Sequence, residues 1–171
     1  MHAVGFWEAT RTMITGAVFS TGRQYRYALW RVWDEVLPTV TFIGLNPSTA
    51  DEFQDDPTLR RCMGYARGWG FGGVFMGNAF ALRSTNPRGL REVSDPVGPL
   101  CDHWLQAMAQ RAALVVAAWG NQGAYRNRDQ DLLQSIEGLH CLGYTKTGQP
   151  KHPLYLPKGL FPVPFTERCP E

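Results

Sequence analysis

The stretch of the chain with the clearest chemical potential is Gly44-Leu-Asn-Pro-Ser48, which follows residues typical of a buried strand at 39–43. Glycine, asparagine and proline close together end that strand in a tight polar loop. In open α/β sheets, ligands bind in the crevice beyond the carboxyl ends of the strands, so this loop could hold a small ring or a phosphate. A strand followed by a simple proline turn is the alternative interpretation.

Three further apolar runs also end in polar residues. Asn78 and Arg83 follow the second run, Trp119-Gly-Asn follows the third, and residues 146–152 follow the fourth. If these ends meet at one sheet edge, they build a single pocket. His152 is held by the proline after it, which suits a group that hydrogen-bonds one point on a ligand, although a lone histidine is often structural.

Carboxylates are scarce near these strand ends, apart from an acidic run at residues 51–56. A solvated loop and helix cap is the simplest interpretation of that run, with Asp56 at the cap. Asp51 could act as a base if it faced the pocket. The chain has no nucleophile elbow and no GxxxxGK[ST] phosphate loop, which disfavours serine hydrolases and nucleoside triphosphatases.

Strands and helices that would position these residues alternate along the chain. The predicted elements are a β-hairpin with arms at 14–20 and 25–33, strands at 39–43, 73–80, 114–119 and 139–143, and helices at 56–69, 99–112 and 124–137. This order predicts an α/β fold, a three-layer α/β/α sandwich with a four-stranded parallel central sheet and an N-terminal β-hairpin. We expect a single domain over residues 1–171, with the hairpin at 14–33, the core at 39–156 and an irregular tail at 157–171.

Composition is that of an ordinary globular protein, with 44% hydrophobic and 19% charged residues in 171. The formal net charge of +2 permits a polyanionic partner without requiring one. The four cysteines have no CxxC pair, so we expect reduced thiols and no metal. No secretory leader or long apolar run is present, which predicts a cytoplasmic protein without a membrane partner. These cysteines are Cys62, Cys101, Cys141 and Cys169.

Taken in order, the strand-end motifs resemble those of the uracil-DNA glycosylase superfamily. The motifs are Gly44-Leu-Asn-Pro-Ser, Asn78, Trp119-Gly120 and His152-Pro153, and the resemblance spans about residues 39–156. The Asn-Pro form is most similar to the branch of mismatch-specific uracil and thymine glycosylases. The whole chain also resembles a bacterial and phage family of unknown function, through Leu-Asn-Pro-Ser-Thr-Ala-Asp and Asp-Pro-Thr-Leu-Arg-Arg-Cys.

The superfamily resemblance implies a role for several residues. Asn46 would orient the attacking water or support the sugar, while His152 would hold a pyrimidine carbonyl and Asn78 would read the base edge. Because an amide cannot take a proton, Asp51 is the expected second catalytic group. The wider base site would comprise Gly44, Leu45, Pro47, Ser48, Phe53, Asn78 and Trp119. The expected DNA contacts are Arg83, Arg88, Lys146, Lys151, Leu154 and Lys158.

Two departures from the superfamily pattern bear on the substrate. Leu154 and Tyr155 stand where a small residue usually follows His-Pro, and the four-cysteine iron–sulfur pattern of some branches is missing. We therefore expect no cofactor and no specificity for plain uracil. The resemblance predicts a monomeric N-glycosidase acting on a damaged or modified base in duplex or single-stranded DNA. The alternatives are an inactive nucleic-acid or nucleotide binding module and an N-glycosidase of free nucleosides or nucleotides.

Overall fold

A computed structural model of the chain describes residues 12–166. Within them, seven strands form one sheet in the order β1-β2-β4-β3-β5-β6-β7. The strands are β1 (Ile14–Phe19), β2 (Arg26–Val32), β3 (Thr39–Gly44), β4 (Gly73–Asn78), β5 (Leu114–Ala117), β6 (Leu139–Cys141) and β7 (Val163–Pro164).

The sheet is mixed, so the predicted four-stranded parallel sheet is wrong as a description of the whole. Strands β4, β3, β5 and β6 are mutually parallel, whereas β1, β2 and β7 run antiparallel to their neighbours. The predicted hairpin forms, but its second arm pairs with β4, so the hairpin extends the sheet. This pairing satisfies backbone groups that would otherwise form an open edge of β4.

Strand β7 lies in the predicted tail, which is therefore not wholly irregular. It pairs with β6 through Cys141 and Val163, and Phe165 beside it is buried in the core. A two-residue strand has no periodicity that a sequence pattern can detect. Its proline is tolerated because β7 lies at the sheet edge, where a missing N–H costs no ladder bond.

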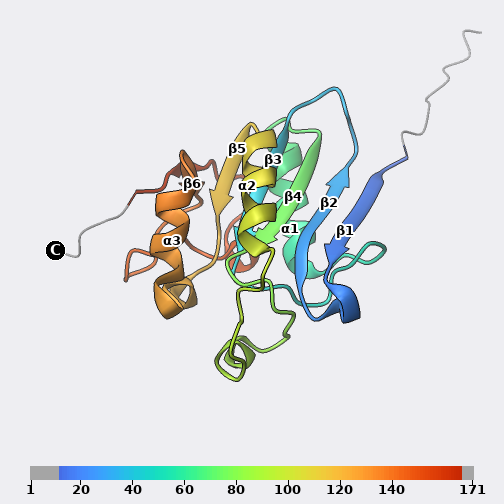
Figure 1. The fold of residues 1–171 in the computed structure, drawn as a ribbon. Coiled ribbons are helices and arrows are strands. Elements are labelled where there is room, and N and C mark those ends of the chain that lie inside the picture. Colours follow the sequence, from blue (N-terminus) through green and yellow to red (C-terminus); the bar gives the residue numbers. More distant parts are fainter. Residues whose placement is uncertain (1–11, 167–171) are drawn as a thin grey trace, which may run out of the picture.

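Three helices cover both faces of the sheet: α1 (Pro57–Gly68), α2 (Cys101–Arg111) and α3 (Arg128–Ser135). Helices α2 and α3 lie in front of the sheet and α1 lies behind it (Figure 1). Asp56 caps α1, where its Oδ1 accepts a hydrogen bond of 2.8 Å from the Leu59 N–H. Helix α3 starts later than predicted because 3₁₀ turns occupy Asn121–Asn127, where Arg126 and Asn127 have positive φ.

Alternating side chains of the parallel strands form two apolar cores. Ile43 packs toward α2 and α3 with Leu105, whereas Phe42 packs toward α1 with Leu59. Consecutive residues of β3 thus belong to opposite layers. This arrangement explains the near-continuous apolar sequence of the central strands.

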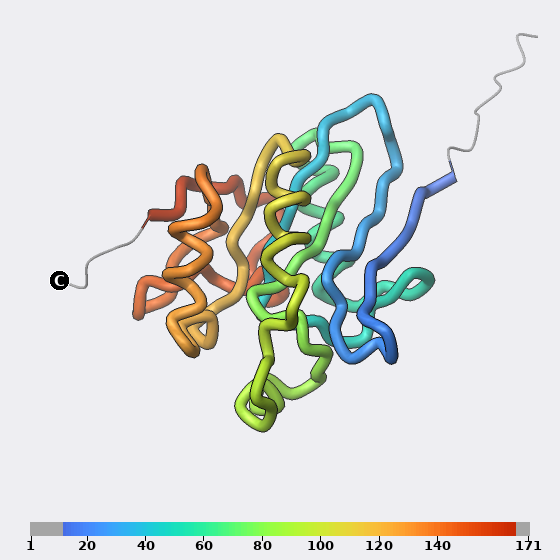
Figure 2. The backbone as a smooth tube through the Cα atoms, viewed as in Figure 1, coloured from blue at the N-terminus to red at the C-terminus, as the bar shows by residue number. Residues whose placement is uncertain are grey.

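Strand β3 lies between β4 and β5, so the chain moves to one side of β3 to form β4 and then crosses back to its other side to form β5. A crevice is expected beyond the carboxyl ends of such neighbouring strands. The loop after β4, yellow-green in Figure 2, extends beyond that edge of the sheet. It runs beside the loop after β3, since the Phe80 N–H donates to the Leu45 carbonyl at 2.9 Å and the Ser84 N–H to the Pro47 carbonyl at 2.9 Å.

No helix in residues 12–166 has the length and apolar character needed to cross a bilayer. Cys62, Cys101 and Cys141 are buried free thiols. Cys169 lies outside the described residues.

Candidate functional site

A cavity of about 370 Å³ opens at the carboxyl ends of the parallel strands. Its wall includes residues from the loops that follow β3, β4, β5 and β6. The cavity therefore lies where the strand order predicts a crevice. Among the residues predicted from the sequence, those that line it are Gly44, Leu45, Asn46, Ser48, Asn78, Trp119, His152 and Leu154.

Asn46 is held by its amide nitrogen. The Nδ2 group donates to the carbonyls of Ser84 at 2.8 Å and Pro47 at 3.2 Å. Because both partners can only accept, these bonds fix which end of the amide faces the protein. They leave Oδ1 as the hydrogen-bonding atom that Asn46 can offer to a water or a ligand. Pro47 itself is not part of the cavity wall.

Asn78 lies opposite Gly44 in the parallel register of β4 and β3. Its side chain is 6% exposed, and its Oδ1 accepts a long bond of 3.4 Å from Arg26. A methyl group built at Gly44 would lie 3.0 Å from the Asn78 Nδ2, which is closer than almost all real contacts of this kind. A side chain at this position would therefore require the Asn78 amide to shift by a few tenths of an ångström.

His152 lies before a short 3₁₀ turn at Pro153–Tyr155. Its Nδ1 accepts a hydrogen bond of 3.2 Å from the Leu154 N–H. Burial lowers the pKa of the imidazole, while the charge of Asp56 acts in the opposite direction. The neutral ring therefore carries its proton on Nε2, which makes Nε2–H a hydrogen-bond donor available to a ligand.

Trp119 is mainly a core residue whose surface reaches the cavity. It is 1% exposed and packs edge-on against Phe165. Its indole N–H donates to Gln149 at 2.9 Å, and Gln149 in turn donates to Asp129 at 2.7 Å. This network fixes the loop between β6 and His152 against the end of β5.

Asp51 does not line the cavity, contrary to the expectation that it acts as the base there. Its Oδ1 accepts hydrogen bonds from the N–H groups of Phe53 at 2.8 Å and Gln54 at 2.9 Å, closing a local turn. These bonds lower the pKa of the carboxyl group. The predicted base contact Phe53 also lies outside the cavity, with 89% of its surface exposed.

Two charged residues line the cavity in addition to the predicted ones: Arg26 from β2 and Asp56 before α1. Strand alternation predicts only that Arg26 shares a face with Ala28 and Trp30, neither of which lines the cavity. For Asp56, the sequence predicts only that it caps the helix. No local sequence pattern predicts that either residue lines the cavity. Arg26 lies there because β2 pairs with β4, and Asp56 lies there because the loop at residues 45–56 folds back.

The residues predicted to contact DNA are dispersed. Leu154 lines the cavity. Arg88, Lys146 and Lys151 are exposed and do not line it. Arg83 is half-buried, donates to the Arg23 carbonyl at 3.3 Å and lies over the Phe19 ring. These side chains therefore do not form one basic surface at the cavity.

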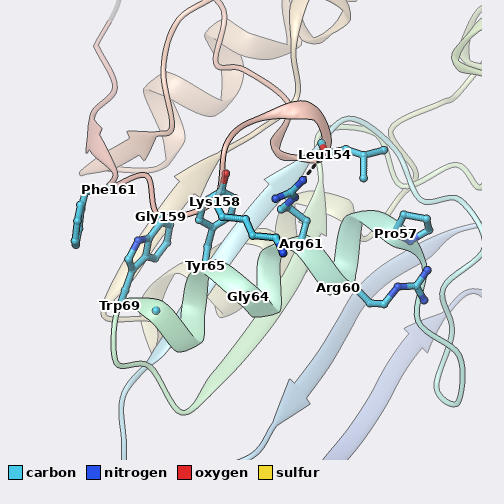
Figure 3. A pocket seen from close by; sticks show the side chains of 11 residues that line it. Pro57, Arg60, Arg61, Gly64, Tyr65, Trp69, Leu154, Lys158, Gly159 and Phe161 are labelled. Carbon is cyan, nitrogen blue, oxygen red and sulfur yellow. Dashed lines mark hydrogen bonds between the residues drawn. The ribbon is translucent and has the colours of Figure 1, made fainter.

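A second cavity, of about 510 Å³, lies between α1 and the segment after His152 (Figure 3). The basic residues in its wall are Arg60, Arg61 and Lys158, and no carboxylate lines it. Arg61 donates to the Leu154 carbonyl at 3.3 Å. Leu154 lines both cavities, so the two adjoin at this residue. The remaining wall is formed by Pro57, Gly64, Tyr65, Gly68, Trp69, Gly159 and Phe161.

Among residues 12–166, no group of three or more histidine, cysteine, aspartate or glutamate side chains could hold a metal ion. The polar and charged groups that line the first cavity include two neutral amides, His152, Arg26 and Asp56. Together they offer hydrogen-bond donors and acceptors to a polar ligand.

A sequence model of one protein family matches residues 26–154 of the chain, and the family is described as "Protein of unknown function (DUF1643)". The match includes every residue of the first cavity except Tyr155. No curated protein and no solved structure matches the chain.

Proposed function

We propose that this chain, which belongs to the DUF1643 family of proteins of unknown function, is an N-glycosidase that hydrolyses the base–sugar bond of a damaged or modified base in DNA. One observation carries the proposal: Asn46, Asn78 and His152 line the same cavity from three different strand ends. At about 370 Å³, the cavity falls within the range of small-ligand sites.

Two of these side chains suit the two halves of the reaction. As the glycosidic bond breaks, its electron pair moves onto the base, and Nε2–H of His152 can donate to the carbonyl where negative charge develops. The free Oδ1 of Asn46 can accept a hydrogen bond from the water that attacks the anomeric carbon. A neutral histidine is suited to the first role because its pKa is lowered.

A proton acceptor is still needed for the water, and Asp56 is better placed for it than Asp51. Asp56 lines the cavity, whereas the Asp51 carboxylate is bound within its own turn. One oxygen of Asp56 accepts from the Leu59 N–H, and the other can take a proton. The proposed general base is therefore Asp56, the residue that caps α1.

Kinship with the uracil-DNA glycosylase superfamily is part of the proposal. It is supported by the order of the motifs and by their meeting at one cavity. A base in a duplex would have to flip out to enter. The second cavity, with its three cationic side chains, lies next to the first at Leu154 and could accept the flanking phosphates. We place this activity in the cytoplasm.

Oligonucleotides carrying uracil, mismatched thymine or hypermodified pyrimidines, single-stranded and in duplexes, test this function. We expect abasic sites, detected by alkaline strand cleavage, with at least one substrate. His152→Ala should reduce the rate by about 10²-fold or more. The matched control is His103→Ala, which changes an exposed histidine on α2. No abasic product from any substrate would contradict the proposal.

One alternative gains support from a particular observation. Arg26 places a guanidinium in the cavity itself, where it would meet the ligand rather than a distant part of a DNA strand. An N-glycosidase of free nucleotides would use such a group. Binding that is insensitive to salt would favour this small ligand, whereas a steep salt dependence indicates many phosphate contacts.

A further inference from the structure

Three buried arginines differ in how their charge is satisfied. Arg31 and Arg128 are 1% and 4% exposed, and each forms an ion pair, with Asp55 and Asp102 respectively. Arg26 is 4% exposed and has no ion pair within the part of the chain that the structure describes. A buried charge without a partner is costly, so its position against a cavity suggests that a ligand supplies the partner.

Hydrogen bonding leaves Arg26 similarly incomplete. A guanidinium has five N–H donors. Nη1 of Arg26 donates to the Ala50 carbonyl at 2.8 Å, whereas the bond from Nη2 to Asn78 is long at 3.4 Å. Its Nε is buried and has no hydrogen-bond partner. Only one of its bonds thus has ordinary length.

Neighbouring charges do not replace the missing partner. Burial lowers the pKa of Arg26 to about 10, so the side chain stays charged at neutral pH. The charges of Asp56 and Asp51 raise this pKa, whereas repulsion from Arg83 and Arg31 lowers it further. Asp56 is instead bound to the Leu59 N–H at the start of α1.

We propose that the Arg26 end of the cavity binds an oxyanion of the ligand, a phosphate or a carboxylate, beside the amide of Asn78. Nη2 of Arg26 is the contacting group, since its present bond is the weak one. Asp56 in the same wall would repel a bare oxyanion, so the ligand also presents an N–H or O–H donor toward Asp56. A nucleotide, or a pyrimidine with an acidic substituent, has both features.

This inference deepens the proposed function, because it specifies the ligand of the same cavity. It can be tested without bond cleavage by calorimetry on the full chain at low salt. The probes are deoxyuridine against deoxyuridine 5′-monophosphate, and uracil against uracil-6-carboxylate. We expect at least one anionic probe to bind about tenfold or more tightly than its neutral counterpart, since bonds to charged groups are strong.

Arg26→Met should abolish that preference, and Arg26→Lys should retain part of it. The control Arg111→Met, at an exposed arginine in the last turn of α2, should leave it unchanged. A preference confined to the monophosphate assigns a phosphate to the site, and one confined to the acidic base assigns a carboxylate. Equal binding of charged and neutral probes, or a preference that survives in Arg26→Met, would overturn the inference. Circular dichroism confirms that each variant is folded, with Arg26→Lys as the second variant if methionine disrupts folding.

The two proposals fail separately. An Arg26-dependent preference without any abasic product supports the oxyanion site and counts against glycosidase activity. Abasic product without that preference supports the activity and contradicts the oxyanion site.

Discussion

Strand β2 carries two buried arginines that are held in opposite ways. Arg31 donates to the Asp55 carboxylate at 2.8 Å and to the carbonyls of Trp30 at 2.9 Å and Asp51 at 2.6 Å. Arg26, five residues earlier, has one bond of ordinary length. The first fixes the acidic loop to the sheet, and the second lines the cavity. The difference separates a charge used for folding from a charge kept available for a ligand.

The largest effect on stability is expected at Arg31. Arg31→Met should lower the free energy of unfolding by about 3 kcal/mol, because it removes a buried ion pair and leaves several acceptors without a donor. Urea denaturation measures the change. Arg31→Lys, which keeps the charge but not the fork of donors, should be intermediate. An unchanged midpoint for Arg31→Met would remove the basis of the comparison.

A smaller loss of stability is expected at Gly44, which packs closely against Asn78. Gly44→Ala should cost about 1–2 kcal/mol of stability, since the new methyl group displaces the Asn78 amide. Ligand affinity should fall with it. Gly64→Ala in α1 is the control, because nothing lies within 4 Å of the added carbon and alanine favours a helix. If both variants behave alike, Gly44 is not required for the placement of Asn78.

Arg26→Met should change the free energy of unfolding by less than about 1 kcal/mol, because the lost bond to Ala50 is offset by removing a buried unpaired charge. Urea denaturation beside Arg31→Met gives a direct contrast between the two positions. A loss as large as that of Arg31→Met would show that Arg26 is a structural residue.

The smallest effect is expected at His152, which should make the stability of the protein depend on pH. Burial lowers its pKa in the folded protein, so the unfolded chain, with a pKa of about 6.5, takes up the proton first. The stability that the neutral ring contributes is therefore present above about pH 6.5 and is lost as pH falls through the lower folded pKa. Urea midpoints of wild type should fall more steeply than those of His152→Gln across this range. Parallel curves would contradict the burial of the ring.

Sequence reasoning located the polar strand ends because they depend on local signals. Apolar runs ending at Gly, Asn and Pro identify Asn46 and Asn78 without knowledge of the rest of the fold. The same reasoning chose Asp51 over Asp56, since the acidic run gives no indication which carboxylate its own turn will bind. It missed Arg26 because β2 reaches the cavity only through long-range pairing with β4.

The matched ends of β3 and β4 also bear on dynamics. Gly44 pairs with Asn78, and the bonds from the Ala79 and Phe80 amides to Gly44 at 2.8 Å and Leu45 at 2.9 Å continue the ladder beyond the strands. The backbone next to Asn46 is thus tied to the backbone next to Asn78. The backbone N–H groups of Ala79 and Phe80 should exchange hydrogen slowly with solvent even when the outer loops open. The cavity wall on this side is preorganised, so little ordering entropy remains to be lost when a ligand enters.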